Sequence, residues 1–205
     1  MSFYDEHVAP VLVNFVCGSP AIRRERLKAL PEAEGVVLEI GAGGGRNFPL
    51  YDATRIARLY ALEPSAAMRR LAQRRADAFG PPLEWLSLEA EQIPLAEKSV
   101  DTVVLTFTLC TIADAPRALA GMKRVLKPGG KLVFLEHGAA PDPNVRRLQE
   151  RLTPLWGALG GGCRLTREPS VLIRDAGFKM AHVDSYYAQG SPRFAGYLSR
   201  GVAFA

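Results

Sequence analysis

The sequence predicts one α/β domain built on a mostly parallel seven-stranded sheet, with helices on both faces. Its 205 residues suit a single domain of ordinary size. Apolar runs bounded by turn residues alternate with helical patterns, which is typical of βαβ units around a parallel sheet. The last two apolar runs follow each other closely, which predicts an antiparallel hairpin strand at the end of that sheet.

The elements follow in order along the chain. The first 30 residues predict one or two helices packed outside the core, and a helix start is expected near Arg46 and Asn47. The expected strands are residues 36–40, 58–62, 83–87, 101–107 and 131–136, and the expected helices are 64–78 and 115–126. The run Lys127-Pro128-Gly129-Gly130 ends the second of these helices, because proline cannot continue a helix and glycine permits the reversal.

After Glu136 the pattern changes. Residues 138–143 predict a loop, 144–159 an amphipathic helix, and the three glycines at 160–162 break it. A further helix is expected at 168–176, and Gly177 stops it. Strands at 179–186 and 194–204 complete the sheet.

Composition narrows the class of protein. Hydrophobic residues make up 48% and charged residues 23%, which are close to soluble globular averages, so we do not expect disorder. The net charge of +5 permits weak attraction to nucleic acid or anionic membrane. The arginine-rich run at 23–26 is interpreted as a solvated helix face, and no aromatic-interleaved basic pattern indicates nucleic-acid binding.

Cysteine and histidine spacing gives little support to a metal site. The three cysteines, Cys17, Cys110 and Cys163, form no C-x-x-C pair, so neither a disulfide framework nor a thiolate zinc site is expected. His7 and His182 lack partners at ligand spacing, and no metal is predicted. A reducing cytoplasm fits this cysteine usage, and the apolar stretch at 8–16 is shorter than the ~20 residues that span a bilayer.

The candidate ligand site begins at residues 36–45, an apolar strand that runs into glycines. Glycines let a backbone approach a ligand closely, and ligands bind at the carboxyl ends of strands in open α/β sheets. Nicotinamide, flavin and S-adenosylmethionine enzymes all use such a turn. The turn by itself therefore leaves the ligand open, and a tight strand-to-helix turn without a ligand is the plain alternative.

Acidic residues at three places favour one of these ligands. Glu63 ends the second strand, where a carboxylate accepts both hydroxyls of a ribose. Glu39 lies beside the glycines, where it would repel a pyrophosphate and attract a sulfonium with its ammonium group. Glu89 and Glu91 follow the third strand, where an acidic side chain accepts from the amine of adenine. Together they indicate S-adenosylmethionine, and they disfavour a nicotinamide-dependent oxidoreductase.

These motifs resemble those of the class I S-adenosylmethionine-dependent methyltransferases, which have a Rossmann-like fold. The resemblance covers about residues 36–135 and rests on 38–45 (LEIGAGGG), 63–65 (EPS), 89–94 (EAEQIP), 99–104 (SVDTVV) and 124–130 (RVLKPGG). It implies S-adenosylmethionine as cofactor and S-adenosylhomocysteine as product. The cofactor-binding residues that we expect are Glu39, Gly41, Ala42, Gly43, Asn47, Glu63, Pro64, Met68, Glu89, Ala90, Glu91, Thr106 and Phe107.

The later part of the chain is similar to the thiol methyltransferase-like branch of this family. The residues that carry this similarity are 136–138 (EHG), 154–156 (PLW) and 162–168 (GCRLTRE). The resemblance implies S-methylation of a small thiol. Close alternatives are N-methylation of a phospholipid or amine and C-methylation of a quinone, and a nucleic-acid-binding protein of the same fold is a more distant one. Animal members of the branch carry an N-terminal membrane anchor that residues 8–16 are too short to provide, so at most peripheral membrane contact is expected.

The acceptor side is placed by the same resemblance. A thiol reacts as its thiolate, so a base is useful, and His137 after the fifth strand is the candidate, with a purely structural hydrogen bond as the alternative. Residues 1–30 are expected to form a helical cap or lid, and 31–205 one methyltransferase domain with an acceptor-site insertion around 138–170. The oligomeric state is left open. The expected acceptor-binding residues are Tyr4, Cys110, Trp156, Cys163 and Arg167.

Overall fold

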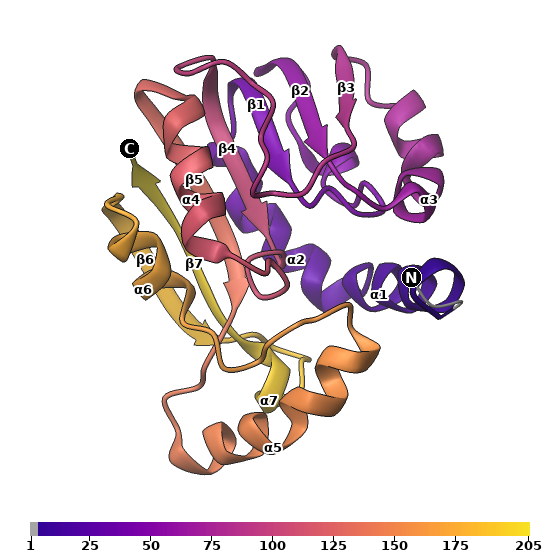
Figure 1. Ribbon diagram of the computed structural model, residues 1–205, viewed down its shortest axis with the longest axis vertical. Helices are drawn as coiled ribbons and strands as arrows, with labels where there is room; N and C mark the ends of the chain where they lie inside the picture. Colours follow the sequence, from indigo (N-terminus) through magenta and orange to yellow (C-terminus); the bar gives the residue numbers. More distant parts are fainter. Residues whose placement is uncertain (1–3) are drawn as a thin grey trace.

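The computed structural model describes residues 4–205 and shows one mixed sheet of seven strands with helices on both sides (Figure 1). The order across the sheet is β3-β2-β1-β4-β5-β7-β6. This confirms the predicted fold class. The strands are β1 (Gly35–Ile40), β2 (Ile56–Leu62), β3 (Leu83–Leu86), β4 (Val100–Thr106), β5 (Leu126–His137), β6 (Lys179–Tyr187) and β7 (Tyr197–Phe204).

The topology creates a crevice between β1 and β4. The chain builds outward from β1 to β2 and β3, then returns to place β4 on the other side of β1. All pairs from β3 to β5 are parallel, whereas β7 lies between β5 and β6 and is antiparallel to both. Loops that leave β1 and β4 in opposite directions open a ligand site at the carboxyl ends of these strands.

Helices cover both faces and extend beyond the carboxyl edge of the sheet. Ser65 caps α3 by accepting from the Met68 amide, and Asp114 caps α4 by accepting from Arg117, as short polar side chains do at helix starts. In Figure 1, α1 and α5 lie beyond the carboxyl ends of the parallel strands. The helices are η1 (Tyr4–Val8), α1 (Ala9–Cys17), α2 (Pro20–Ala29), η2 (Leu30–Glu32), η3 (Phe48–Leu50), α3 (Ala66–Asp77), α4 (Ala115–Val125), α5 (Pro143–Leu159), α6 (Pro169–Asp175) and α7 (Arg193–Gly196).

The core has two halves, one on each face of the sheet. In β4, Val103 and Leu105 pack with α4 residues such as Leu119, whereas Val104 faces the other side with Val37 of β1. Strands that are buried on both faces read as continuous apolar runs. That is why β1 and β4 stand out in the sequence.

Most boundaries lie within two residues of the sequence prediction, and three local features differ more. No α-helix starts at Arg46 and Asn47; a 3-10 turn, η3, stands there instead, since Asn47 turns inward to bond with buried groups. The predicted turn at 127–130 belongs to β5, which pairs at Leu126 and resumes after an irregularity. The last predicted strand starts later, because residues 193–196 form α7.

The predicted cap at 1–30 and insertion at 138–170 correspond to separate helices in the described part of the chain. From residue 4 onward the cap contains η1, α1 and α2, and the insertion contains α5. Their assignment as a lid and an acceptor insertion stays a prediction. Within residues 4–205, every helix is too short or too polar to cross a membrane.

Candidate active site

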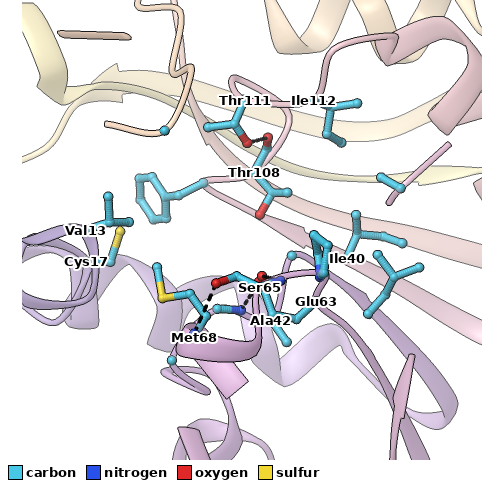
Figure 2. Close-up of a pocket in the computed structure, with 18 of the residues that line it drawn as sticks. Val13, Cys17, Ile40, Ala42, Glu63, Ser65, Met68, Thr108, Thr111 and Ile112 are labelled. Carbon is cyan, nitrogen blue, oxygen red and sulfur yellow. Dashed lines mark hydrogen bonds between the residues drawn. The ribbon is translucent and has the colours of Figure 1, made fainter. Parts of the chain in front are cut away.

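A cavity of about 610 Å³ opens at the carboxyl ends of β1, β2 and β4 (Figure 2). Its volume lies in the range of about 300–1,000 Å³ that is common for small-molecule sites. The wall combines four loops after strands, the helix α1, one residue of α2, and two glycines after α5. The lining segments are 9–10, 13–14, 17, 26, 40–44, 46, 62–65, 68, 89–92, 106–108, 111–113 and 160–161.

The glycine-rich turn forms the cavity floor next to β1. Gly41 and Gly43 have φ angles of 64° and 55°, which side chains disfavour. A Cβ on Gly41 would lie 2.4 Å from the Thr108 side chain, in the loop after β4. The Ala42 amide donates to the Leu62 carbonyl at 3.1 Å and fixes the turn against β2. The positive φ angles and the nearby Thr108 side chain explain why glycine is needed at 41, and close approach to a ligand stays a prediction.

Glu63 ends β2 and joins the two loops on this side of the cavity. One carboxylate oxygen accepts from the Gly43 amide at 2.8 Å and the other from the Ser65 amide at 2.8 Å. Burial raises the pKa of Glu63, while these two amide bonds act in the opposite direction. A carboxylate can accept about four hydrogen bonds, so each oxygen keeps a lone pair that can face the cavity. This arrangement fits a ligand with two neighbouring hydroxyls, such as a ribose.

The loop after β3 brings Glu89, Ala90 and Glu91 to the cavity, as predicted. Glu89 is exposed and Ala90 is buried. Glu91 also accepts from the Asp114 amide at 2.9 Å, and this bond ties the loop to the start of α4. Leu62 and Ile112 add apolar surface, so a flat ring between these segments would meet both polar and apolar groups.

Two predicted cofactor residues, Glu39 and Asn47, lie behind the wall and do not line the cavity. Glu39 is 2% exposed, and its oxygens accept from Asn47 Nδ2 at 3.0 Å and from Tyr51 Oη at 2.8 Å. Burial raises the pKa of Glu39 to about 7 against these hydrogen bonds. Asn47 also donates to Thr106 Oγ1 at 3.0 Å. Their observed contacts hold the glycine turn and the end of β4 together.

Arg26 is a cavity residue that the sequence analysis missed. Its Nη1 donates to Asn47 Oδ1 at 2.7 Å and to Thr106 Oγ1 at 2.6 Å, and its guanidinium lies 5.1 Å from the centre of the Phe107 ring. The side chain is 6% exposed, so the interpretation of residues 23–26 as a solvated face was wrong at this position. A helical run of alternating charge gives no local signal for which arginine turns inward.

The helix α1 contributes Asn14 and Cys17 to the cavity, and neither was singled out for it from the sequence. Arg46 Nε donates to Asn14 Oδ1 at 2.8 Å, which joins α1 to the glycine turn. In Figure 2, Val13 and Cys17 lie on the side opposite Ile112. The N-terminal helix is thus part of the cavity wall in this structure.

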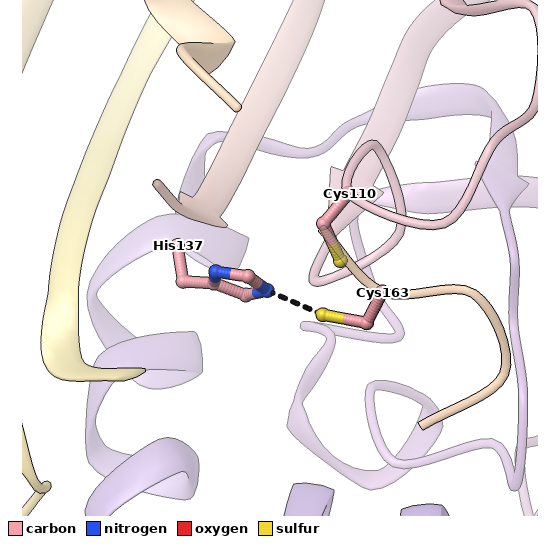
Figure 3. A group of neighbouring side chains, drawn as sticks. All are labelled: Cys110, His137 and Cys163. Atoms are coloured by element: carbon pink, nitrogen blue, oxygen red, sulfur yellow. Dashed lines mark hydrogen bonds between the residues drawn. The ribbon is translucent and has the colours of Figure 1, made fainter. Parts of the chain in front are cut away.

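A second group of polar side chains, Cys110, His137 and Cys163, meets beside segments that line the cavity (Figure 3). His137 Nε2 is 3.0 Å from Cys163 Sγ, and the ligand atoms of Cys110, His137 and Cys163 all lie within 4.8 Å of one another. All three residues are buried. The hydrogen bond from Cys110 and the neighbouring His137 lower the pKa of Cys163 to about 5. Burial lowers the pKa of His137, but the hydrogen bond to Cys163 and the negative charges of Cys163 and Glu136 together outweigh it, so the net shift of the pKa is upward.

Each of the remaining predicted acceptor residues lies in or contacts the end of α5, or contacts the loop after β4. Tyr4 Oη donates to the Leu159 carbonyl at 3.0 Å, Trp156 packs edge-on against Phe194, and Arg167 donates to the Leu109 carbonyl. The cavity outlined above has none of the five predicted acceptor residues in its lining. His137 likewise points to Cys163, and its role as a base stays a prediction.

Charge is distributed unevenly around the cavity. Glu63, Glu89 and Glu91 surround one part, whereas Arg26 supplies a buried guanidinium beside Thr106. An elongated ligand with hydroxyls and an amine at one end and a carboxylate at the other would find partners for each group. The residues present therefore fit S-adenosylmethionine.

Comparison with known proteins agrees with this geometry. Residues 38–134 match the family model described as a methyltransferase domain. The chain is 31% identical over 178 residues to the thiol S-methyltransferase TMT1B of Rattus norvegicus, covering 79% of this chain and 69% of the relative.

Other relatives have different acceptors in their names. A ubiquinone/menaquinone biosynthesis C-methyltransferase of Dinoroseobacter shibae is 29% identical, with 72% of this chain and 50% of the relative covered. A phosphatidylethanolamine N-methyltransferase of Cereibacter sphaeroides is 27% identical, with 69% and 70% covered.

A solved structure has the same fold along the whole chain. It is a Thermotoga maritima protein described as a SAM-dependent methyltransferase and possible histamine N-methyltransferase, with a TM-score of 0.67 and 23% identity. The alignment covers 98% of this chain and 97% of that one. Sequence motifs, cavity geometry and these relatives agree, and the chain belongs to the class I S-adenosylmethionine-dependent methyltransferases.

Proposed function

We propose that this enzyme transfers the methyl group of S-adenosylmethionine to the sulfur of a small thiol. The observation that carries the proposal is the extent of the similarity to thiol S-methyltransferase TMT1B. It runs over 178 residues, well beyond the matched core at 38–134, and so includes segments outside the cofactor-binding half. The loop that holds Cys163 and the end of β5 at His137 both lie outside that core.

The cavity residues supply a partner for each part of the cofactor. We assign Glu63 to the ribose hydroxyls, Glu89 and the Ala90 backbone to adenine, and Arg26 to the carboxylate. The backbone near Thr106 faces the amino group in this assignment. Glu39 and Asn47 act indirectly, because their hydrogen bonds fix the glycine turn and Thr106.

The cofactor supplies a methyl group on a positively charged sulfur, which is an electrophile. The enzyme's own contribution is to align an acceptor with that group and to exclude water. Phe107, Thr108 and Thr111 line the cavity next to the two glycines at 160–161, and this wall is our proposed acceptor side. Loss of the thiol proton is required, since the thiolate is the nucleophile.

A lipid-like acceptor is the second candidate, either a phospholipid amine or a quinone. Exposed apolar side chains favour it, because Phe15 of α1 is 77% exposed and Leu155 of α5 is 63% exposed. Residues of α1 line the cavity, and the lining glycines at 160–161 follow α5. Such a face suits peripheral contact with a membrane. A reducing cytoplasm is still our proposed location, with all three cysteines free in the structure.

A methyl-transfer assay with labelled cofactor tests the proposal. The reduced enzyme is offered alkyl thiols, hydrogen sulfide, phosphatidylethanolamine vesicles and a demethylquinone, and products are identified by mass. We expect label on the thiols, and we expect Glu63→Gln to lower the rate with each of them. Label on the phospholipid or quinone without label on any thiol would show that the second candidate is correct.

A further inference from the structure

We infer that Cys110, His137 and Cys163 bind a zinc ion whose fourth coordination position takes the acceptor thiolate. The first half of this inference, the zinc site, stands on the side-chain cluster alone. The second half rests on the proposed thiol acceptor.

The cluster joins three segments that are far apart in the sequence. Cys110 follows β4, His137 ends β5, and Cys163 lies in the loop between α5 and α6. A backbone hydrogen bond holds two of these segments together, because the Arg164 amide donates to the Cys110 carbonyl at 3.0 Å. A zinc ion would link these segments at one point beneath the acceptor side.

The donor atoms are of the right kind and at suitable separations. Two thiolates and one imidazole form the Cys₂His set found in catalytic zinc sites, where three protein ligands leave one position open. With Zn–S near 2.3 Å and Zn–N near 2.0 Å, donors in a tetrahedral site are roughly 3.5–3.8 Å apart. The three donors here lie within 4.8 Å of one another, with 3.0 Å between Nε2 and the Cys163 sulfur. A small increase in the distance between His137 Nε2 and Cys163 Sγ accommodates the ion.

The surroundings of the cluster favour a cation. Glu136 is fully buried next to His137, and one of its carboxylate oxygens accepts from the Thr108 and Leu109 amides. Its other oxygen has no hydrogen-bond partner among the described residues, and neither has His137 Nδ1. Arg167 contributes one positive charge nearby. The charges of Cys110, Glu136 and Cys163 all act on Arg167. With both cysteines as thiolates and Glu136 as a carboxylate, the cluster would carry more negative charge than this guanidinium offsets, and a dication would compensate it, because buried charges need compensation.

A disulfide between Cys110 and Cys163 would be a different use of the same cysteines. It would give no role to His137, whose Nε2 lies 3.0 Å from the Cys163 sulfur. A metal ion uses all three donors at once. The imidazole therefore favours a metal site over a disulfide.

The position of the cluster connects it to the cavity. Cys110 lies between the lining residues Thr108 and Thr111, and Cys163 follows the lining glycines at 160–161. A Cβ built on Gly160 would be 3.6 Å from Cys163 Cβ, so little more than a glycine backbone separates the cavity from the cluster. An acceptor that enters between these loops reaches the open position of the ion.

The reaction balances with zinc as a Lewis acid that is neither oxidised nor reduced. The acceptor thiol binds zinc as the thiolate and its proton leaves to water. A sulfur lone pair then forms the new C–S bond, while the sulfonium C–S bond breaks and its electron pair stays on the cofactor sulfur. The product thioether is uncharged and a weaker ligand, so it leaves.

Metal binding is measured first, without turnover. The full-length reduced protein is stripped with a chelator and titrated with Zn²⁺ against a chromophoric competitor, and in parallel with Co²⁺. We expect about one equivalent, with the intense visible bands and thiolate charge transfer of a tetrahedral cobalt–thiolate site. Cys110→Ser, Cys163→Ser and His137→Gln each lower affinity by about 100-fold or more. His182→Gln, at an exposed histidine of β6, is the matched control and keeps wild-type stoichiometry.

The acceptor role is tested next on the Co²⁺ form. Adding an alkyl thiol should shift the cobalt bands, and adding its methyl thioether should not. Absence of metal binding in folded wild-type protein overturns the zinc site, and bands that no thiol perturbs overturn the acceptor role. Equal thiol methylation with and without metal also overturns that role while leaving the proposed function intact. Metal binding without any thiol methylation contradicts the proposed function but not the zinc site.

Discussion

Replacing Glu39 with glutamine should flatten the dependence of stability on pH. Glu39 is buried against the glycine turn, and burial raises its pKa from 4.5 to about 7 in the folded protein. The folded chain then holds a proton that the unfolded chain has released. The contribution of Glu39 to the free energy of unfolding is therefore fully present below about pH 4.5, and it is lost as the pH rises through about 7.

The size of the effect follows from these two pKa values. At about 1.4 kcal/mol for each pH unit, the difference between 4.5 and about 7 corresponds to about 3 kcal/mol lost between acid and neutral pH. Glutamine resembles the protonated acid and can keep a hydrogen bond with Tyr51 or Asn47. Its own cost, about 1 kcal/mol for an imperfect bond, does not change with pH.

Urea unfolding between pH 5 and pH 8 measures this prediction. The free energy of unfolding of Glu39→Gln, relative to the wild type, should increase by about 2–3 kcal/mol across that range. The control is Glu84→Gln, at an exposed glutamate of β3. Its free energy of unfolding should change with pH in the same way as that of the wild type. Parallel curves for Glu39→Gln as well would refute the argument that burial dominates at this carboxylate.

Three further substitutions test the site and the core. Gly41→Ala should abolish cofactor binding in calorimetry, because the added Cβ would lie 2.4 Å from the Thr108 side chain. The control is Gly80→Ala, where φ is also positive but the added Cβ has nothing within 4 Å. This control should lose only about 1–2 kcal/mol of stability. Glu63→Gln should weaken cofactor binding by about 10- to 100-fold, since a charged acceptor is lost; unchanged affinity would exclude it from ribose binding. Leu119→Ala should cost about 2–5 kcal/mol in chemical denaturation, and a loss below 1 kcal/mol would contradict its full burial.

Local signals in the sequence were enough to predict part of the cavity lining. The glycines at 41 and 43, Glu63 and the loop at 89–91 all line the cavity as expected. These residues follow strands whose apolar runs are visible without any long-range information, and parallel strands bring their carboxyl ends to one edge. Position after a strand therefore predicts position in the cavity.

The burial of Arg26 and the inward turn of Asn47 depended on tertiary packing. Both side chains meet at Thr106, and the bond between Arg26 and Thr106 joins residues 80 positions apart in the chain. Charge along a helix has the same local appearance whether that face is solvated or buried. The sequence pattern could therefore not identify which arginine enters the core.

By itself, the sequence determined the order of elements, the glycine turn and the acidic residues around it, because periodicity and turn chemistry act over a few residues. Only the tertiary structure decided that β7 lies between β5 and β6, and that Cys110, His137 and Cys163 meet. Their spacing matches no short metal-binding pattern, since each comes from a different segment. Contacts of that kind arise when the packed sheet brings distant loops to the same edge, and no local pattern records them.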